Sequence, residues 1–511
     1  MINEELEYAS GDGSSELDYG ESHGSELGYD DEDEYGRYPK YRKEQIFQPI
    51  DFTKLKTKIA CTIGPASNDV PGLIRLFDAG MGIARFNMSH GTKKDNHTMV
   101  RKYFQAKKLR PYKTCALMLD LRGREIRQCK VTEPAEGIKF ELGEKCKVRE
   151  DRYVTGASTK EIIQVDSQQI MKCVRPGDLV SFEDGTVDAL VLEVAEDEIV
   201  IQFKNAGVIT GNKSVRISGQ RLGDMPLLKV QDREDIEQIA KKYKFDYITI
   251  PNVTSVKDLQ EAKQACGEDG KLGIIAKIDN LEAVHQFAFI LKYADAVCIV
   301  RNELAFELPP DKLMIAQKWM VQTANMESVP IFVQSQVLET MVSAETQGKE
   351  QIQETQEISN AVLDGCDGFI LSHETSVGKK PLDSAILLAK SMAEAENIYD
   401  HEKAYEEARA VSETEGKNGK PTDMLCSTAT QIALDNNVDL FICLTSTGGI
   451  ARNLARQKPM QTILACSENS NVVRQANCTR GVIGYKVPAY LSKCFFHAII
   501  VMFRVNGSKP S

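Results

Sequence analysis

The sequence has no long hydrophobic run, and no apolar stretch approaches the roughly 18 residues that a membrane-spanning helix requires. Its first 36 residues contain no lysine or arginine, whereas secretory signals and transit peptides begin with basic residues. The 13 cysteines include no Cys-x-x-Cys pair and no zinc-like spacing. Scattered thiols of this kind indicate a reducing compartment. We therefore expect a cytoplasmic protein that does not bind membranes.

The sequence also lacks an excess of basic charge. Residues 1–36 carry 13 Asp and Glu, so removing them from the net charge of −11 leaves +2 for residues 37–511. A nearly neutral body argues against nucleic acid as a partner. Residues 1–45 are rich in Glu, Asp, Gly, Ser and Tyr and cannot bury a core. They are predicted to form a disordered acidic tail that either solubilises the protein or docks onto another molecule.

The composition of the rest is that of a folded enzyme. Hydrophobic residues make up 42% of the chain and charged residues 27%, which is ordinary for a globular protein. A chain of 511 residues is too long for one compact domain, so about three domains are expected.

Short apolar runs alternate with amphipathic stretches from Lys58 onward. The runs are continuously apolar, which is typical of parallel strands buried on both faces. Eight of them predict a (β/α)₈ TIM barrel, an α/β fold. The predicted strands are Ile59–Ile63, Gly82–Phe86, Cys115–Leu119, Tyr247–Ile250, Gly273–Ala276, Ala296–Val300, Ile331–Val333 and Gly368–Leu371.

About 120 residues separate the third and fourth of these strands, far more than a strand-to-helix connection needs. Residues 128–222 contain strand-like pieces and turns, and they predict a small β-barrel lid inserted into a barrel formed by residues 46–127 and 223–400. The expected lid strands are Cys146–Val148, Ile162–Val165, Leu179–Phe182 and Ile199–Phe203.

Residues 401–511 are expected to form a C-terminal α/β domain, shorter than usual, after a charged linker over Glu406–Pro421. The predicted elements are a helix near Ser427–Asn436, a strand Leu440–Leu444, a helix Ile450–Gln457 and a strand Thr462–Ala465. For His497–Arg504 the sequence leaves helix and strand both open.

Charged residues follow several of the barrel strands, where the active sites of such barrels gather. Phosphoryl transfer requires cations that hold phosphate oxygens and carboxylates that hold Mg²⁺. Any one of these residues alone is more simply a surface charge, but six at corresponding strand ends indicate a site. They are Arg85, Arg127, Lys277, Asp279, Arg301 and Glu303.

Four ordered motifs resemble the pyruvate kinase family: Lys58–Ser67, Arg85–Gly91, Asn360–Gly365 and Leu371–Thr375. The similarity extends from about Phe47 to Pro381 and continues more weakly afterwards. It implies a Mg²⁺- and K⁺-dependent, ATP-forming phosphotransferase of glycolysis. Its substrates would be phosphoenolpyruvate and ADP, and its assembly a homotetramer.

The resemblance also implies residue roles. Arg85 and Lys277 would bind and neutralise the transferring phosphoryl group, Ser335 would place a hydroxyl near the enolate carbon, and the Asn302 loop would receive the substrate carboxylate. Nucleotide contacts are implied for Asn87, His90, Arg127 and Lys213. Metal ligands are implied for Asp279 and Glu303 (Mg²⁺ or Mn²⁺) and for Asn87, Ser89, Asp120 and the Leu121 carbonyl (K⁺, with Glu125 nearby).

The chain departs from the family at several of these positions. The family has Lys-Ile-Glu-Asn and Arg-Gly-Asp-Leu-Gly where this chain has Asp279 and Glu303. The first metal carboxylate is therefore shorter than in the family and the second is longer. Asn302 and Ala305 replace the two glycines of the second motif. Further changes are Arg122 for lysine, Arg124 for proline, His373 for glycine and Thr445–Ile450 for the sugar-bisphosphate loop. A catalytically weak paralogue that serves as a binding or structural subunit is therefore the alternative.

Overall fold

The structure is a computed structural model. It describes residues 43–49, 51, 54–124, 126–131, 136–150, 157–167, 169–211, 213–217, 226–267, 271–343, 349–414, 421–436, 438–488 and 499–503. Most of the predicted acidic tail and Glu125 lie outside the described residues. The first described segment forms helix α1 (Lys43–Phe47), which begins before the predicted tail ends at residue 45.

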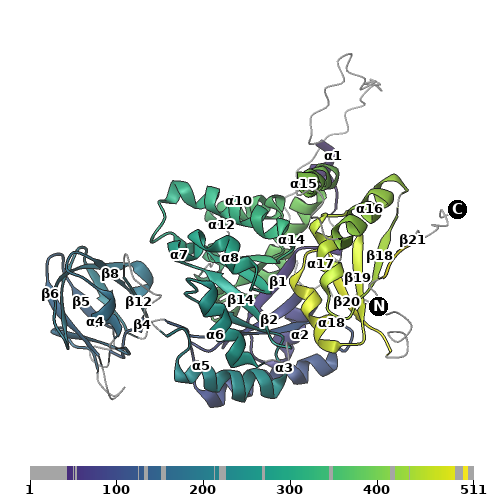
Figure 1. Cartoon of the computed structure of the whole chain (residues 1–511). Coiled ribbons are helices and arrows are strands. Elements are labelled where there is room, and N and C mark those ends of the chain that lie inside the picture. Colours follow the sequence, from purple (N-terminus) through teal and green to yellow (C-terminus); the bar gives the residue numbers. More distant parts are fainter. Residues whose placement is uncertain are drawn as a thin grey trace, which may run out of the picture. The chain divides into compact units, whose positions relative to one another are not determined.

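Eight parallel strands close into a barrel, which confirms the predicted fold class (Figure 1). Their order around the barrel is β1-β17-β16-β15-β14-β13-β3-β2. Every predicted strand is present, because a strand covered on both faces must be apolar at consecutive positions. The strands are β1 (Lys58–Thr62), β2 (Met81–Asn87), β3 (Ala116–Asp120), β13 (Tyr247–Ile250), β14 (Gly273–Ile278), β15 (Ala296–Val300), β16 (Ile331–Gln334) and β17 (Gly368–Leu371).

Helices surround these strands, and local sequence fixes where several of them begin. In α3 the Thr92 hydroxyl accepts a hydrogen bond from the Asp95 amide while the Asp95 side chain accepts one from the Thr92 amide. Proline occupies the first turn of α2, α10 and α14, where no amide hydrogen is needed. The longer helices are α2 (Val70–Asp78), α3 (Lys93–Leu109), α6 (Val256–Cys266), α10 (Pro310–Met326), α12 (Lys349–Asp364) and α14 (Pro381–Asn397).

The barrel interior is filled with side chains. Ile83, Met118, Cys298, Phe332 and Ile370 form part of a fully buried cluster inside the strands. A larger cluster fills the space between strands and helices. Because the interior is packed, ligands have access only to the rim, and the residues after the strand ends determine the chemistry there.

The insertion forms a seven-stranded sheet in the order β4-β12-β8-β9-β10-β6-β7. An isolated bridge between Gln128 and Val165 joins the two ends of this sheet and closes it into the predicted small barrel. Strand β9 was not predicted, although its burial alternates along most of its length. The strands are β4 (Ile126–Arg127), β6 (Lys145–Glu150), β7 (Ile162–Val165), β8 (Leu179–Phe182), β9 (Val187–Val194), β10 (Ile199–Phe203) and β12 (Ser214–Ile217).

The C-terminal domain is a four-stranded sheet with helices. Strands β18 (Leu440–Leu444), β19 (Thr462–Ser467) and β20 (Val482–Lys486) are parallel. Part of the segment for which helix and strand were both considered, His497–Arg504, forms strand β21 (Ile499–Phe503), antiparallel to β18. Helices α16 (Pro421–Asp435), α17 (Gly449–Arg456) and α18 (Ser470–Gln475) accompany the sheet.

The predicted linker is wrong over its first part, where residues 406–414 belong to helix α15 (His401–Thr414). Charged residues suit an exposed helix face as well as a linker, and the composition alone did not separate the two. Tyr405 anchors the buried face, because its hydroxyl donates to the Ser427 carbonyl at 3.1 Å.

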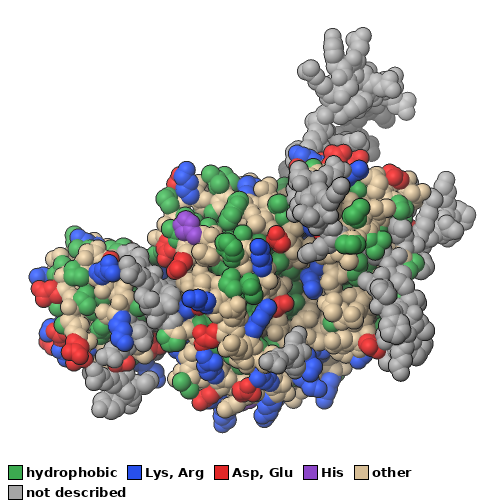
Figure 2. Space-filling model, viewed as in Figure 1, with side chains coloured by type: hydrophobic (Ala, Val, Ile, Leu, Met, Phe, Trp, Pro, Cys, Tyr) green, Lys and Arg blue, Asp and Glu red, His purple; other side chains and the backbone are tan. Residues whose placement is uncertain are grey.

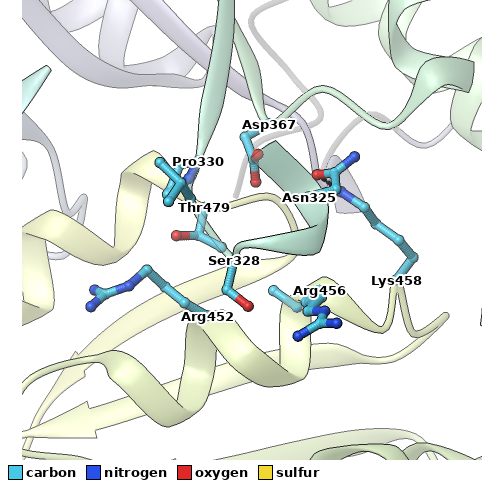
Figure 3. Close-up of a pocket in the computed structure, with 10 residues that line it drawn as sticks. Asn325, Ser328, Pro330, Asp367, Arg452, Arg456, Lys458 and Thr479 are labelled. Carbon is cyan, nitrogen blue, oxygen red and sulfur yellow. Dashed lines mark hydrogen bonds between the residues drawn. The ribbon is translucent and has the colours of Figure 1, made fainter. Parts of the chain in front are cut away.

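The barrel and the C-terminal domain meet through a polar interface (Figure 3). Lys458 reaches from the end of α17 to Asn325 (2.9 Å) and to the Gly365 carbonyl (2.8 Å). Asp367 accepts hydrogen bonds from the Ile331 and Arg480 amides. The small pocket beside these contacts contains none of the candidate active-site residues.

Charge is mixed on the face shown in Figure 2, where acidic and basic side chains are interspersed among polar and hydrophobic ones. This agrees with the near-neutral charge of residues 37–511. Within the described part of the chain, no helix is both long and apolar enough to cross a membrane.

Candidate active site

Asp120 is the centre of the candidate site. It ends strand β3, is 1% exposed, and its Oδ2 accepts hydrogen bonds from Arg85 Nε (2.9 Å) and Lys277 Nζ (2.8 Å). Arg85 Nη2 also pairs with this oxygen. Burial favours the neutral acid, but Arg85 and Lys277 outweigh it and lower the pKa of Asp120. The carboxylate therefore orients two cations at the mouth of the barrel.

Arg85 and Lys277 are predicted phosphate ligands, and two different strands of the barrel position them, with β3 and β13 between the two. Arg85 lies on β2, where Nη1 also donates to the Thr62 hydroxyl at 2.7 Å. Lys277 lies on β14, and both side chains are almost fully buried. Cys298, inside the barrel, is within electrostatic reach of Lys277, Arg85, Asp120 and Asp279, although burial is the main reason that its pKa rises to about 12. These four charged groups therefore converge.

Asp279 follows strand β14 and is also buried. Its Oδ2 accepts from the Asn252 amide at 2.8 Å and its Oδ1 from Asn280 Nδ2 at 3.0 Å. Burial raises the pKa of Asp279 to about 6, despite these bonds and the nearby Lys277. Because burial disfavours the charged form of Asp279, a cation bound beside it would strongly stabilise the carboxylate.

Glu303 lies on the short helix α9 (Arg301–Leu304) after β15. It forms an ion pair with Arg216, which comes from lid strand β12. The charge of the same arginine also lowers the pKa of Asp279, although burial outweighs it, so Arg216 acts electrostatically on both carboxylates. Asn302 Nδ2 contacts Glu303 Oε1 at 3.4 Å, and no hydrogen-bond partner is found for Asn302 Oδ1 among the described residues.

Ser335 and Gln336 follow β16 with positive φ angles of 70° and 53°. Such backbone is unfavourable for residues with side chains and persists only where neighbours enforce it. Arg301 does so, since its Nε donates to the Ser335 carbonyl (3.1 Å) and its Nη2 to the Gln336 carbonyl (2.5 Å). Arg301, expected among the cations at the mouth that hold phosphate oxygens, instead fixes the turn that carries Ser335.

Two of the predicted nucleotide contacts, Arg127 and Lys213, lie on or directly before paired lid strands. Ser214 of β12 is in register with Arg127 of β4, and the carbonyl of Lys213, the residue before Ser214, accepts from the Gln128 amide at 2.9 Å. Desolvation and four basic neighbours lower the pKa of His90, at the rim, to about 4; these neighbours are Arg127, His373, Arg85 and Lys213. This clustering of positive charge suits an anionic ligand.

The donor groups fit the two implied cations. Asp279 and Glu303 are oxygen ligands, and Mg²⁺ typically uses one or two carboxylates together with substrate phosphates. Asp120 Oδ1 is buried and no hydrogen-bond partner is found for it among the described residues, so it is open to a monovalent cation. Of the other implied K⁺ ligands, Asn87 Oδ1 accepts from the Ser89 amide at 3.0 Å, and Leu121 follows Asp120 directly.

The model of the pyruvate kinase barrel domain matches residues 54–385, and that of the pyruvate kinase alpha/beta domain matches residues 423–504. The chain belongs to the pyruvate kinase family. Its relatives within the family include pyruvate kinase of Eimeria tenella, which is 31% identical over 459 residues (89% of this chain and 85% of that protein).

Human pyruvate kinase PKLR is 30% identical over 433 residues, or 83% of this chain and 74% of that protein. Among solved structures, a Cryptosporidium parvum pyruvate kinase superposes with a TM-score of 0.79 at 32% identity, covering 88% of this chain and 90% of that one. A second structure of C. parvum pyruvate kinase, with the same score and identity, is a complex with ADP.

Two departures from the pyruvate kinase pattern have structural partners in this member. Arg124 is buried and pairs with Asp258, with one Nη1–Oδ2 distance of 2.9 Å. Arg122 Nη1 donates to Asp235 at 2.5 Å. Asp258 lies on α6 and Asp235 ends α5 (Val230–Asp235), so both arginines connect the loop after β3 to helices around the barrel.

Thr62 and Arg216 were not predicted from the sequence as site residues. Thr62 is the last residue of β1, and its position at a strand end was the available signal. Arg216 carries no such signal, because its contact with Glu303 joins positions 87 residues apart in two different domains.

Proposed function

We propose that this pyruvate kinase family member transfers the phosphoryl group of phosphoenolpyruvate to ADP, giving pyruvate and ATP, with Mg²⁺ or Mn²⁺ and K⁺ as cofactors. The observation that carries the proposal is the buried Arg85–Asp120–Lys277 group. It presents two fixed cations where phosphoryl transfer needs charge stabilisation. The ADP complex of a relative at 32% identity supports the nucleotide as acceptor.

In this proposal Arg85 binds the phosphoryl group of the bound substrate, and Lys277 stabilises its charge as it moves to the nucleotide. Arg127 and Lys213 hold the phosphates of ADP, with His90 beside them. Asp279 and Glu303 would hold the divalent cation, which would supply charge neutralisation for the phosphoryl group. The Ser335 hydroxyl lies near the carbon that takes up a proton when the enolate becomes pyruvate, and the Asn302 loop receives the substrate carboxylate.

A lactate dehydrogenase-coupled assay tests the proposal directly. Purified protein should form pyruvate from phosphoenolpyruvate and ADP with Mg²⁺ and K⁺, and lactate dehydrogenase then reduces the pyruvate with NADH, whose loss is followed. Omission of any one of the four should lower the rate strongly. A preparation that binds ADP and Mn²⁺ with no turnover would instead favour the alternative, a binding or structural subunit. The Glu303–Arg216 pair favours that alternative, because it engages a candidate metal ligand.

The exchanged carboxylates provide a separate test of whether the site is maintained. If the short Asp279 and the long Glu303 compensate for one another across one cation, Asp279→Glu and Glu303→Asp should each lower kcat/KM. The double variant should then recover activity, with a coupling energy of about 1–3 kcal/mol. The measurement is kcat/KM for phosphoenolpyruvate across the four proteins at fixed K⁺ and titrated Mg²⁺. Additive gains from the two single changes would contradict compensation.

We expect fructose 1,6-bisphosphate not to activate this protein. Where regulated members have Thr-Lys-Ser-Gly-Arg-Ser, residues 445–450 carry no cationic side chain. The loop instead binds itself, as the Gly448 amide donates to the Thr445 hydroxyl at 2.9 Å. The check is the phosphoenolpyruvate saturation curve with and without the effector, and a clear leftward shift would contradict the expectation.

The assembly and location follow from family resemblance alone. We infer a homotetramer, which light scattering coupled to size-exclusion chromatography would measure, and a cytoplasmic enzyme of glycolysis, which fractionation of cells would measure.

A further inference from the structure

Arg216 is the point where the lid contacts the candidate metal site. It lies on β12 and its side chain is 16% exposed, so most of it is withdrawn from water. One guanidinium nitrogen pairs with Glu303, and the guanidinium carbon lies 4.2 Å from the centre of the Phe306 ring. Two barrel residues three positions apart therefore hold one lid arginine, by charge and by a cation–π contact.

The lid approaches the same aromatic ring at a second place. Gly185, in the turn after β8, lies so close to Phe306 that a β-carbon on it would be 2.0 Å from the ring. Its φ of +90° is also one that glycine adopts readily. Phe306 is 41% exposed but contacts both this turn and Arg216, so the lid meets the barrel at two places beside Glu303.

At this interface the guanidinium of Arg216 occupies the position beside Glu303 that a metal cation would take. The guanidinium of Arg216 pairs with Glu303 and its charge also lowers the pKa of Asp279, so it offsets carboxylate charge at this site as a divalent cation would. A cation bound at Glu303 would lie beside the guanidinium, and two positive charges at this separation in a partly buried site repel each other. Occupation by the metal and by Arg216 should therefore oppose one another.

We propose that Arg216 is a positioning residue that competes with the divalent cation for Glu303 and so couples metal binding to release of the lid. The inference rests on the proposed function in one respect, that Glu303 is a metal ligand. The coupling is reciprocal: if Arg216 lowers the affinity for the metal by a given factor, metal binding weakens the contact between Arg216 and Glu303 by the same factor.

The test uses the full chain without substrates and titrates Mn²⁺, followed by the electron paramagnetic resonance signal of the free ion. Arg216→Met keeps an unbranched apolar stem and removes the guanidinium charge; it should bind Mn²⁺ about tenfold more tightly than the parent. Arg149→Met is the matched control, because Arg149 is an exposed lid arginine paired with Glu198. It should leave the affinity unchanged.

Hydrogen exchange of the β12 segment gives a second readout that does not depend on activity. In the parent, Mn²⁺ should increase exchange of residues 214–217, whereas in Arg216→Met exchange should be fast with or without the ion. Arg216→Gln serves as a second uncharged variant, and circular dichroism checks that both fold.

The outcomes separate the inference from the function on which it rests. Parent binding with unchanged Mn²⁺ affinity in both uncharged variants would overturn the competition and leave the proposed function intact. The same result with a raised KM for ADP would identify Arg216 as a phosphate ligand instead. Absence of Mn²⁺ binding in the parent and in both uncharged variants would overturn the metal role of Glu303 and the inference with it.

Discussion

Lys277→Met is expected to lower kcat/KM for phosphoenolpyruvate by about 10²- to 10³-fold, the usual cost of removing one preorganised charge from a transition state. Lys277 is 9% exposed and its ammonium lies 2.8 Å from Asp120, so its position is fixed before substrate binds. Methionine has nearly the same length and fills the same space without the charge. The loss should appear in kcat more than in KM, because the charge on the phosphoryl group changes most during transfer.

Two comparisons make this result interpretable. Lys257→Met changes an exposed lysine on α6 and should leave kcat/KM within experimental error of the parent. Mn²⁺ affinity and thermal unfolding of Lys277→Met should stay close to those of the parent, because Asp120 keeps Arg85 as its partner. Turnover above about a tenth of the parent rate would remove Lys277 from the proposed mechanism.

Asp120→Asn is expected to abolish measurable turnover and to lower the free energy of unfolding of the barrel by about 3–5 kcal/mol. The substitution keeps the shape of the side chain but leaves Arg85 and Lys277 buried together without a negative charge. Two like charges in a site of low water content then repel each other and lose solvation. The measurement is urea unfolding followed by circular dichroism, read from the midpoint at unchanged slope.

The loss in free energy of unfolding should be smaller when one of the two cationic side chains is also removed. In Asp120→Asn/Lys277→Met the remaining arginine still donates to Thr62, so the double variant should be more stable than Asp120→Asn alone. Asp311→Asn, at an exposed ion pair with Lys312, should change stability by less than about 0.5 kcal/mol. Equal losses at Asp120 and Asp311 would show that the buried group does not depend on charge balance.

The barrel could be predicted from the sequence because its strands are buried on both faces. Strand β15 is apolar at five consecutive positions, and its predicted limits, Ala296–Val300, are those of the structure. The lid was harder to predict, since β9 alternates between buried and partly exposed positions and contains Asp188 and Glu193. The later part of helix α15 was predicted to be a linker, because linkers and exposed helix faces are both rich in charged residues.

The site could be predicted as a set of residues but not as a set of contacts. The position of Asp120 at a strand end was evident, and family resemblance made it a K⁺ ligand. Only the structure shows that its Oδ2 is the shared acceptor of Arg85 and Lys277. The support of the Ser335 turn by Arg301 was likewise out of reach, because it depends on positive φ angles that the residues Ser-Gln do not signal.

The closure of the barrel constrains how this protein folds during synthesis. Strand β1 pairs with β17, so that Lys58 lies beside Gly368, 310 positions further along the chain. At roughly 5–20 residues per second, a ribosome needs about 15–60 s to make that interval. During this time one edge of β1 has no partner strand, and the apolar runs that define the fold are exposed. The nascent barrel is therefore most open to aggregation, and most in need of chaperones, until its last strand emerges.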